Sequence, residues 1–196
     1  MKDFISTLTF LLLLSLFLFS FTDTKKPATR SATHANKTGS SSVTVKEHKD
    51  NPYYIIINKS KYELQVFDDE GWYATYPVVF GSSDLSDKMV AGDKRTPEGK
   101  FKVILKKIHP KWAFELLLDY PNQESVRKFT DRMNKGLIPK NSKMGNGIAI
   151  HATRPSEEWT VDYFQNWTDG CVSLKYSEAK DLYSYIPVGT PVTIVR

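Results

Sequence analysis

The stretch WTDGCVSL, residues 167 to 174, contains the only cysteine of this 196-residue chain. A polar turn, Thr168 to Gly170, leads to Cys171, and the residues after it alternate between apolar and polar as those of a strand do. Glycine before the cysteine allows a positive φ or a close approach of the backbone to a substrate. The pattern predicts a thiol at the start of a strand, presented by a turn.

A histidine that can serve as a base precedes this thiol in the chain. His151 ends the apolar run Ile148-Ala149-Ile150, which is typical of a buried strand. A strand that carries an imidazole and a turn that carries a thiol can bring a base next to a nucleophile, as cysteine-dependent acyl transfer requires. We therefore predict Cys171 as the nucleophile and His151 as the proton acceptor and donor. The alternative is a structural pair, because free cysteines often behave as small buried hydrophobes.

These residues resemble the signature of the L,D-transpeptidase catalytic domains of bacterial cell-wall enzymes. In that family a histidine at a strand end is followed by Ser/Thr-His-Gly-Cys, an apolar residue, and Arg or Asn. Asp169 stands where many members have histidine and Ser173 where many have Arg or Asn, so the chain looks closer to a branch with Trp-Thr-Asp-Gly-Cys. Further segments similar to the family are residues 96–101, 118–122 and 188–192, and the resemblance spans Tyr53 to Arg196.

The resemblance implies a mainly β fold, a mixed β-sandwich with short helices, and a transferase without metal or organic cofactor. The implied partners are peptidoglycan stem peptides. Cys171 would be acylated at the third residue of a tetrapeptide stem, release D-alanine and pass the acyl group to an amine of another stem or of a wall-anchored protein. Such an enzyme would serve cell-wall biogenesis and cell shape. Two alternatives stay open: an L,D-carboxypeptidase or endopeptidase that uses water as acceptor, and a non-catalytic wall-binding module.

Other residues near the motif have expected roles. Backbone N–H groups of Gly170 and Cys171, with that of Asp169, would stabilise the tetrahedral oxyanion. The resemblance suggests that a backbone carbonyl around Ala152 fixes the histidine tautomer. The Asp169 side chain is expected to bond backbone amides or a cation such as Arg154.

Substrate contacts are expected from residues near the cleft. The segment between Pro110 and Met144 is interpreted as an insertion that covers one edge of the sheet and lines the substrate cleft, with Trp112 and Tyr120 as aromatic walls. Ordinary core packing is the alternative for both rings. Thr168 and Ser173, which flank the nucleophile, are further candidates for substrate binding.

The N-terminal part has a different character. Residues 4–21 are almost continuously apolar, with Lys2 before them and lysines after them, which predicts a signal peptide or membrane anchor within residues 1–22. Residues 23–50 are rich in Ser, Thr and Lys and are expected to be a flexible linker to a catalytic domain at residues 51–196. We therefore expect export to the periplasm or cell envelope, with membrane contact only through residues 4–21 if they are uncleaved.

Charge and periodicity complete the expectations. A net charge of +5 and a pI near 9.1 are too small to indicate nucleic-acid binding. The protein is also expected to be a monomer. Alternation and turn residues predict an antiparallel meander followed by further strands. Strands are expected at residues 53–57, 62–67, 72–80, 101–105, 148–150, 172–174 and 192–195. One helix is expected from an Asn122 cap to Gly136, and a second from a Ser177 cap to Pro187 with Ala179, Leu182 and Ile186 facing the core.

Overall fold

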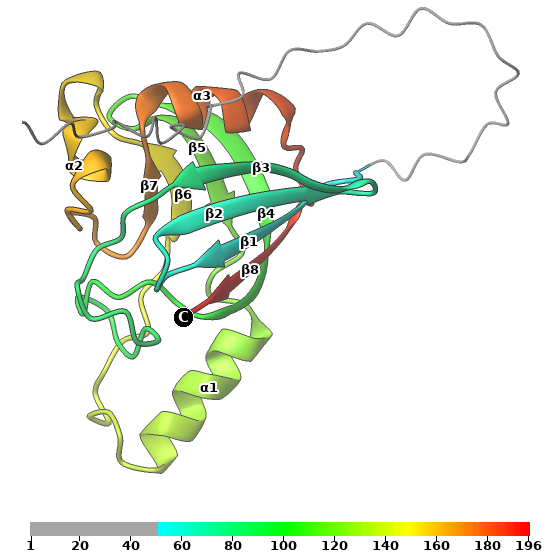
Figure 1. Cartoon of the computed structure of the whole chain (residues 1–196). Helices are drawn as coiled ribbons and strands as arrows, with labels where there is room; N and C mark the ends of the chain where they lie inside the picture. Colours follow the sequence, from blue (N-terminus) through cyan, green and yellow to red (C-terminus); the bar gives the residue numbers. More distant parts are fainter. Residues whose placement is uncertain (1–50) are drawn as a thin grey trace, which may run out of the picture. The chain divides into compact units, whose positions relative to one another are not determined.

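The computed structural model describes residues 51–196, which contain eight strands and three α-helices (Figure 1). The strands are β1 (Tyr54–Asn58), β2 (Glu63–Asp68), β3 (Gly71–Pro77), β4 (Gly99–His109), β5 (Ala113–Leu118), β6 (Ala149–Ala152), β7 (Val172–Leu174) and β8 (Pro191–Val195). The helices are α1 (Gln123–Asn134), α2 (Trp159–Asp162) and α3 (Tyr176–Tyr185), and residues 155–157 form a 3-10 turn. The predicted signal or anchor and the predicted linker lie outside the described residues.

No helix among residues 51–196 is both long enough and apolar enough to cross a bilayer.

All eight strands belong to one curled sheet in the order β3-β2-β1-β8-β4-β5-β6-β7. The first three form the expected antiparallel meander, whereas β1 pairs with β8 and β6 pairs with β7 in parallel. Val79, just after β3, exchanges two backbone hydrogen bonds of 2.9 and 2.8 Å with Ser173 of β7, so the two edges of the sheet meet. Figure 1 shows β1, β2 and β3 in front of β5, β6 and β7. The predicted fold class, mainly β with short helices, is confirmed.

Alternating aliphatic side chains of the strands fill the space inside the curled sheet. Ile55 and Ile57 of β1 face Leu64 and Val66 of β2, and all four are almost completely buried. Burial of each such side chain stabilises the fold by about 1.5–3 kcal/mol relative to exposure. The core therefore follows from the period-two pattern of the strands.

Helix α3 adds the predicted apolar face to this core. Ala179, Leu182 and Ile186 are buried as expected. The helix begins earlier than predicted, because Lys175 occupies the N-cap position and Ser177 lies inside the first turn. Ser177 is therefore not the cap.

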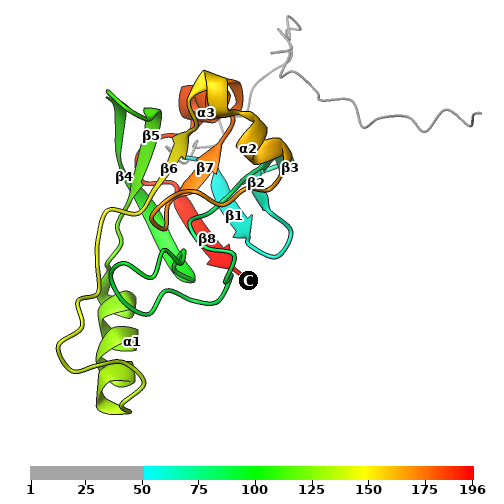
Figure 2. The same cartoon turned by 90° about the vertical axis from the view of Figure 1, so that its left-hand side faces the viewer.

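Helix α1 begins and ends as predicted. The Asn122 side chain accepts a hydrogen bond of 3.1 Å from the N–H of Ser125, and Gly136 adopts a φ of +69° just after the last turn. The expectation that this segment covers an edge of the sheet is wrong. The edge strands are β3 and β7, whereas α1 lies beyond the ends of the strands, with none of its residues buried (Figures 1 and 2).

Strand β5 lies inside the segment that was interpreted as an insertion. It joins β4 to β6, and β4 itself extends to His109, beyond the predicted end of that strand at residue 105. Glu115 interrupts the apolar run of β5 and conceals the strand in the sequence. In the structure its carboxylate forms an ion pair of 3.0 Å with Lys107 on β4, so cross-strand pairing compensates the buried charge.

A buried lysine holds the long loop between β3 and β4. Lys59 is 1% exposed, and its ammonium group contacts the carbonyl oxygens of Ser86 and Thr96 at 3.2 and 3.1 Å and the Glu98 carboxylate at 2.8 Å. The hydroxyl of Thr96 then donates to the carbonyl oxygen of Gly170 at 2.9 Å. The loop thereby connects the end of β1 to the turn that carries Cys171.

We expect Lys59→Met to lower the free energy of unfolding by about 2 kcal/mol, because methionine fills the space but leaves the carboxylate and two carbonyls without a donor. Denaturant unfolding of the full-length chain measures the change. Lys61→Met is the matched control, since Lys61 is exposed and two residues away. Equal stability of the two variants would contradict the role of Lys59.

Candidate active site

The parallel pairing of β6 with β7 determines how His151 and Cys171 face each other. The register matches Ile150 with Val172 and His151 with Ser173. Cys171, one residue before β7, is therefore level with Ala149, on the same face of the two strands as His151. Cys171 and His151 are thus diagonal neighbours on adjacent strands. The register brings thiol and imidazole to one face.

The His151 ring is fixed at one nitrogen. Nδ1 lies 2.9 Å from the carbonyl oxygen of Ala152, and because a carbonyl only accepts hydrogen bonds, Nδ1 carries the proton. Nε2 is then the unprotonated nitrogen of the neutral ring. Burial lowers the pKa of His151, while the Ala152 carbonyl and the Glu115 carboxylate oppose that effect. The imidazole is therefore neutral near pH 7.

The Cys171 thiol is half-buried and protonated. Its Sγ donates to the carbonyl oxygen of Gly147 at 3.5 Å. Burial raises the pKa of the thiol to about 11, the N–H of Ala149 bonded to the sulfur opposes this, and the carboxylates of Glu115 and Asp169 reinforce it. Thiol and imidazole thus both rest uncharged, and a thiol in this state needs a base to take its proton before it can act as a nucleophile.

Hydrogen bonds within the turn fix its backbone. The Thr168 hydroxyl donates to the carbonyl oxygen of Cys171 at 2.8 Å and accepts from the N–H of Gly170 at 3.2 Å. Gly170 has a φ of +127°, in a region that favours glycine. The expected oxyanion donor at Gly170 is thus already engaged. Within residues 51–196 the N–H groups of Asp169 and Cys171 donate to no acceptor, so these two are the available donors of the turn.

Trp112 belongs to an aromatic group around the histidine. Its ring centroid lies 5.2 Å from that of His151 and 5.0 Å from that of Trp167. The ring of Trp167 meets the imidazole edge-on at 5.6 Å. Trp112 therefore lies beside the predicted base, and its role as a wall of the substrate cleft stays a prediction. Trp167, which begins the cysteine motif, is not among the residues predicted from the sequence.

Tyr120 packs into the core. It is 8% exposed, packs against Phe101 at 6.0 Å, and its hydroxyl donates to the carbonyl oxygen of Met144 at 3.3 Å. Together with Phe129 and Lys88 it lines a cavity of about 10 Å³ beside α1. A cavity of that size holds at most one water molecule. Among residues 51–196 Tyr120 forms neither a hydrogen bond with Cys171 nor a ring contact with His151.

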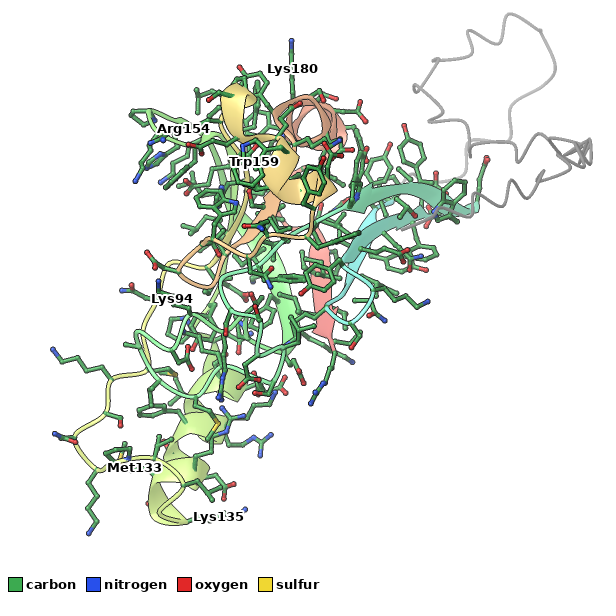
Figure 3. All side chains as sticks on the ribbon, turned by 60° about the vertical axis from the view of Figure 1, so that its left-hand side comes forward. Lys94, Met133, Lys135, Arg154, Trp159 and Lys180 are labelled. Carbon is green, nitrogen blue, oxygen red and sulfur yellow. The ribbon has the colours of Figure 1, made fainter. Side chains whose placement is uncertain are left out.

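Two further candidates differ in exposure. Ser173 is fully buried, and within residues 51–196 its hydroxyl has no hydrogen-bond partner. Asp169 is exposed. The expected pair between Asp169 and Arg154 is not formed, because Arg154 binds Glu157 at 2.9 Å, three residues away on the same turn. Figure 3 shows Arg154 near Trp159 at the end of the domain opposite Met133.

Glycine 81 marks a point where three backbone segments converge. A Cβ atom on Gly81 would lie 2.3 Å from the carbonyl oxygen of Lys94, 2.5 Å from that of Thr168 and 2.6 Å from the nitrogen of Gly170. Figure 3 shows Lys94 on the loop that runs beside the segment leading to Cys171. The turn can approach the β3–β4 loop this closely only because residue 81 lacks a side chain.

Comparison with known proteins identifies the family. The sequence model of the L,D-transpeptidase catalytic domain, also called YkuD, matches residues 52–194. The chain belongs to this family. The predicted resemblance is thereby confirmed.

Individual proteins are similar to this chain. YqjB of Bacillus subtilis (strain 168), whose name provisionally assigns it to the L,D-transpeptidases, is 29% identical over 142 residues, which cover 72% of this chain and 70% of YqjB. Among solved structures, Bd1075 of Bdellovibrio bacteriovorus is 27% identical with a TM-score of 0.53. Pgp2, the helical cell shape determining protein of Campylobacter jejuni, is 23% identical with a TM-score of 0.53 and shares the fold. Each of the two structural matches covers 74% of this chain but only 48% of the other, so this chain spans about half the length of Bd1075 and Pgp2.

Substitution of Gly81 tests the convergence of segments. We expect Gly81→Ala to lower the free energy of unfolding by about 2 kcal/mol and to slow alkylation of Cys171, because all three atoms near the new methyl group belong to the backbone and must shift. Denaturant unfolding and iodoacetamide labelling measure both effects. Ser83→Ala, at an exposed position of the same loop, serves as the control. Wild-type stability and labelling in Gly81→Ala would refute the tight approach.

Proposed function

We propose that this chain is a peptidoglycan L,D-transpeptidase with Cys171 as nucleophile and His151 as proton acceptor and donor. The family acts on peptidoglycan stem peptides, and the proposed substrate is a tetrapeptide stem. The observation that carries the proposal is the β6–β7 register, which sets a half-buried thiol and a neutral imidazole on one sheet face. The bond from Nδ1 to Ala152 supports it, because it leaves Nε2 free to accept a proton.

The proposed acylation converts the Cys171 thiol into a thioester. The thiol proton passes to Nε2 of His151 while Sγ of Cys171 attacks the carbonyl carbon of the third stem residue. The N–H groups of Cys171 and Asp169 would stabilise the oxyanion, an interaction typically worth about 2.7–4 kcal/mol per donor. The tetrahedral intermediate collapses, the amide C–N bond breaks, and the imidazolium gives its proton to the departing amine of D-alanine. A thioester on Cys171 and a neutral imidazole result.

The second half-reaction regenerates the enzyme. The amine of another stem, or of a wall protein, attacks the thioester carbonyl and gives a proton to His151. The C–S bond then breaks and the thiolate recovers that proton from the imidazolium. Water can replace the amine in the same scheme, which would make the chain an L,D-carboxypeptidase or endopeptidase. We propose that the reaction takes place outside the cytoplasm, with residues 1–22 as the signal or anchor and residues 23–50 as the linker.

Product analysis tests the proposal. Incubation of the full-length chain with disaccharide tetrapeptides is expected to yield cross-linked products and free D-alanine, read by mass spectrometry. Cys171→Ala should give neither, and His151→Ala should slow turnover roughly 100-fold or more. Trimmed products alone would identify water as the acceptor. Unchanged substrate with wild-type protein would contradict catalysis and favour a wall-binding module.

The pH dependence of thiol alkylation gives an independent test. Because the pKa of His151 is lowered by burial, we expect the labelling rate to rise through a midpoint below the usual histidine value of about 6.5. In His151→Ala the base is lost, so this rise in the labelling rate should disappear. Only the rise toward the thiol pKa of about 11 should remain. Labelling of the unfolded chain provides the intrinsic thiol rate as control. A wild-type profile in His151→Ala would show that the imidazole does not activate the sulfur.

A further inference from the structure

A row of polar side chains crosses four adjacent strands at the level of the base. The registers match Lys107 on β4 with Glu115 on β5, Glu115 with His151 on β6, and His151 with Ser173 on β7. Directly opposed residues point to the same face of a sheet, with Cβ atoms about 4.5–5.5 Å apart in antiparallel pairs. The row therefore places a carboxylate beside the imidazole, and an ammonium group on the far side of the carboxylate.

The carboxylate in this row is buried and has one charged partner. Glu115 is 6% exposed, and its Oε1 lies 3.0 Å from Nζ of Lys107, whose side chain is 42% exposed. A buried carboxylate is costly unless it is paired, and an apolar residue would suit the run Ala113–Leu118 better. Glu115 lies directly opposite the base, so its negative charge acts on the imidazole.

We propose that Glu115, restrained by Lys107, is a positioning residue that tunes the proton affinity of His151 during attack by Cys171. The inference rests on the proposed function, in which His151 accepts the thiol proton. When that proton reaches Nε2, the ring becomes a cation, and the neighbouring carboxylate stabilises it by Coulomb attraction in a poorly solvated site. Lys107 limits the effect by neutralising part of the carboxylate charge.

The same carboxylate acts against the thiolate, and position decides which effect dominates. Glu115 raises the pKa of both His151 and Cys171. It lies directly opposite His151 on the adjoining strand, whereas Cys171 lies on the far side of β6 and one diagonal step away. Coulomb attraction falls with distance, so stabilisation of the imidazolium exceeds destabilisation of the thiolate.

Other charged groups around the base are few. His109, at the end of β4, lowers the pKa of His151, and Asp169 and Lys88 act on Cys171 with opposite signs. The neighbour of His151 on β7 is the uncharged Ser173, and the rings that pack against the imidazole are those of Trp112 and Trp167. Helix α3 covers the other face of β5, where Phe114 packs on Tyr176 and Tyr183. Glu115 is thus the carboxylate in register with the base.

Substitutions of the two partners should move the base in opposite directions. In the full-length chain, Glu115→Gln should lower the midpoint of the acid limb of Cys171 alkylation by about one pH unit, because the imidazolium loses its counter-charge. The plateau rate should fall roughly threefold, since a weaker base removes the thiol proton less well. Lys107→Gln should raise the midpoint, because the carboxylate is no longer neutralised. A purely structural ion pair would not produce shifts of opposite sign.

Lys106→Gln is the matched control. Lys106 is the neighbouring lysine of β4, and its Nζ donates to the carbonyl oxygen of Tyr183 of α3 at 2.7 Å, on the other face of the sheet. In Lys106→Gln the midpoint of the acid limb of Cys171 alkylation should stay at the wild-type value. Titration of the His151 ring by NMR, with the signal assigned by its loss in His151→Gln, measures the same midpoints without reference to the cysteine. If Glu115→Gln fails to fold, the upward shift in Lys107→Gln alone decides the question.

The outcomes separate the two proposals. Midpoints that move in opposite directions support the tuning role of Glu115. Unchanged midpoints, or shifts of the same sign, overturn it, even when His151→Ala slows alkylation and the proposed acyl transfer stands. If His151→Ala instead labels as fast as the wild type, the base role proposed for His151 fails, while the NMR midpoints still test the coupling to Glu115.

Discussion

The parallel register between β6 and β7 is the constraint on which the candidate site depends. A shift of one residue would move either His151 or Cys171 to the other face of the sheet, because side chains alternate along a strand. Two features secure the register. Val79 forms a bridge with Ser173 on one side of β7, and the paired residues Ile150 of β6 and Val172 of β7 are both buried. The geometry of the thiol and the imidazole is thus a property of the whole sheet.

Burial of this pair sets its chemistry. Removal of water raises the pKa of the thiol and lowers that of the imidazole, so both groups rest uncharged. An uncharged resting pair avoids the desolvation of two ions. In the proposed mechanism it also makes attack depend on the ability of the ring to hold a proton. The Ala152 carbonyl, which fixes Nδ1, and the Glu115 carboxylate opposite the ring both favour that state.

The turn that carries the nucleophile is held by polar contacts rather than by an apolar core. The Thr168 hydroxyl donates to the carbonyl of Cys171 within the turn. The Thr96 hydroxyl donates to the carbonyl of Gly170 and so connects the turn to the loop that Lys59 binds. Gly81 allows the segments to approach within contact distance. Such contacts are directional, which suits a turn whose backbone N–H groups have to point in defined directions.

The motifs of the sequence by themselves determined the family, and the resemblance implied the mainly β class. Periodicity and turn residues, which are local signals, determined the cap of α1 at Asn122 and the nucleophile and base candidates. Only the tertiary structure decided that Ala113–Leu118 is a strand, that Glu115 faces His151, that the Tyr120 hydroxyl bonds the carbonyl of Met144, and that Thr168 accepts from the N–H of Gly170. Those facts depend on pairing between segments far apart in the chain. No local pattern encodes which strand will be the neighbour. A charged residue that interrupts an apolar run, as Glu115 does, can therefore be the one that pairs with side chains on the adjacent strands.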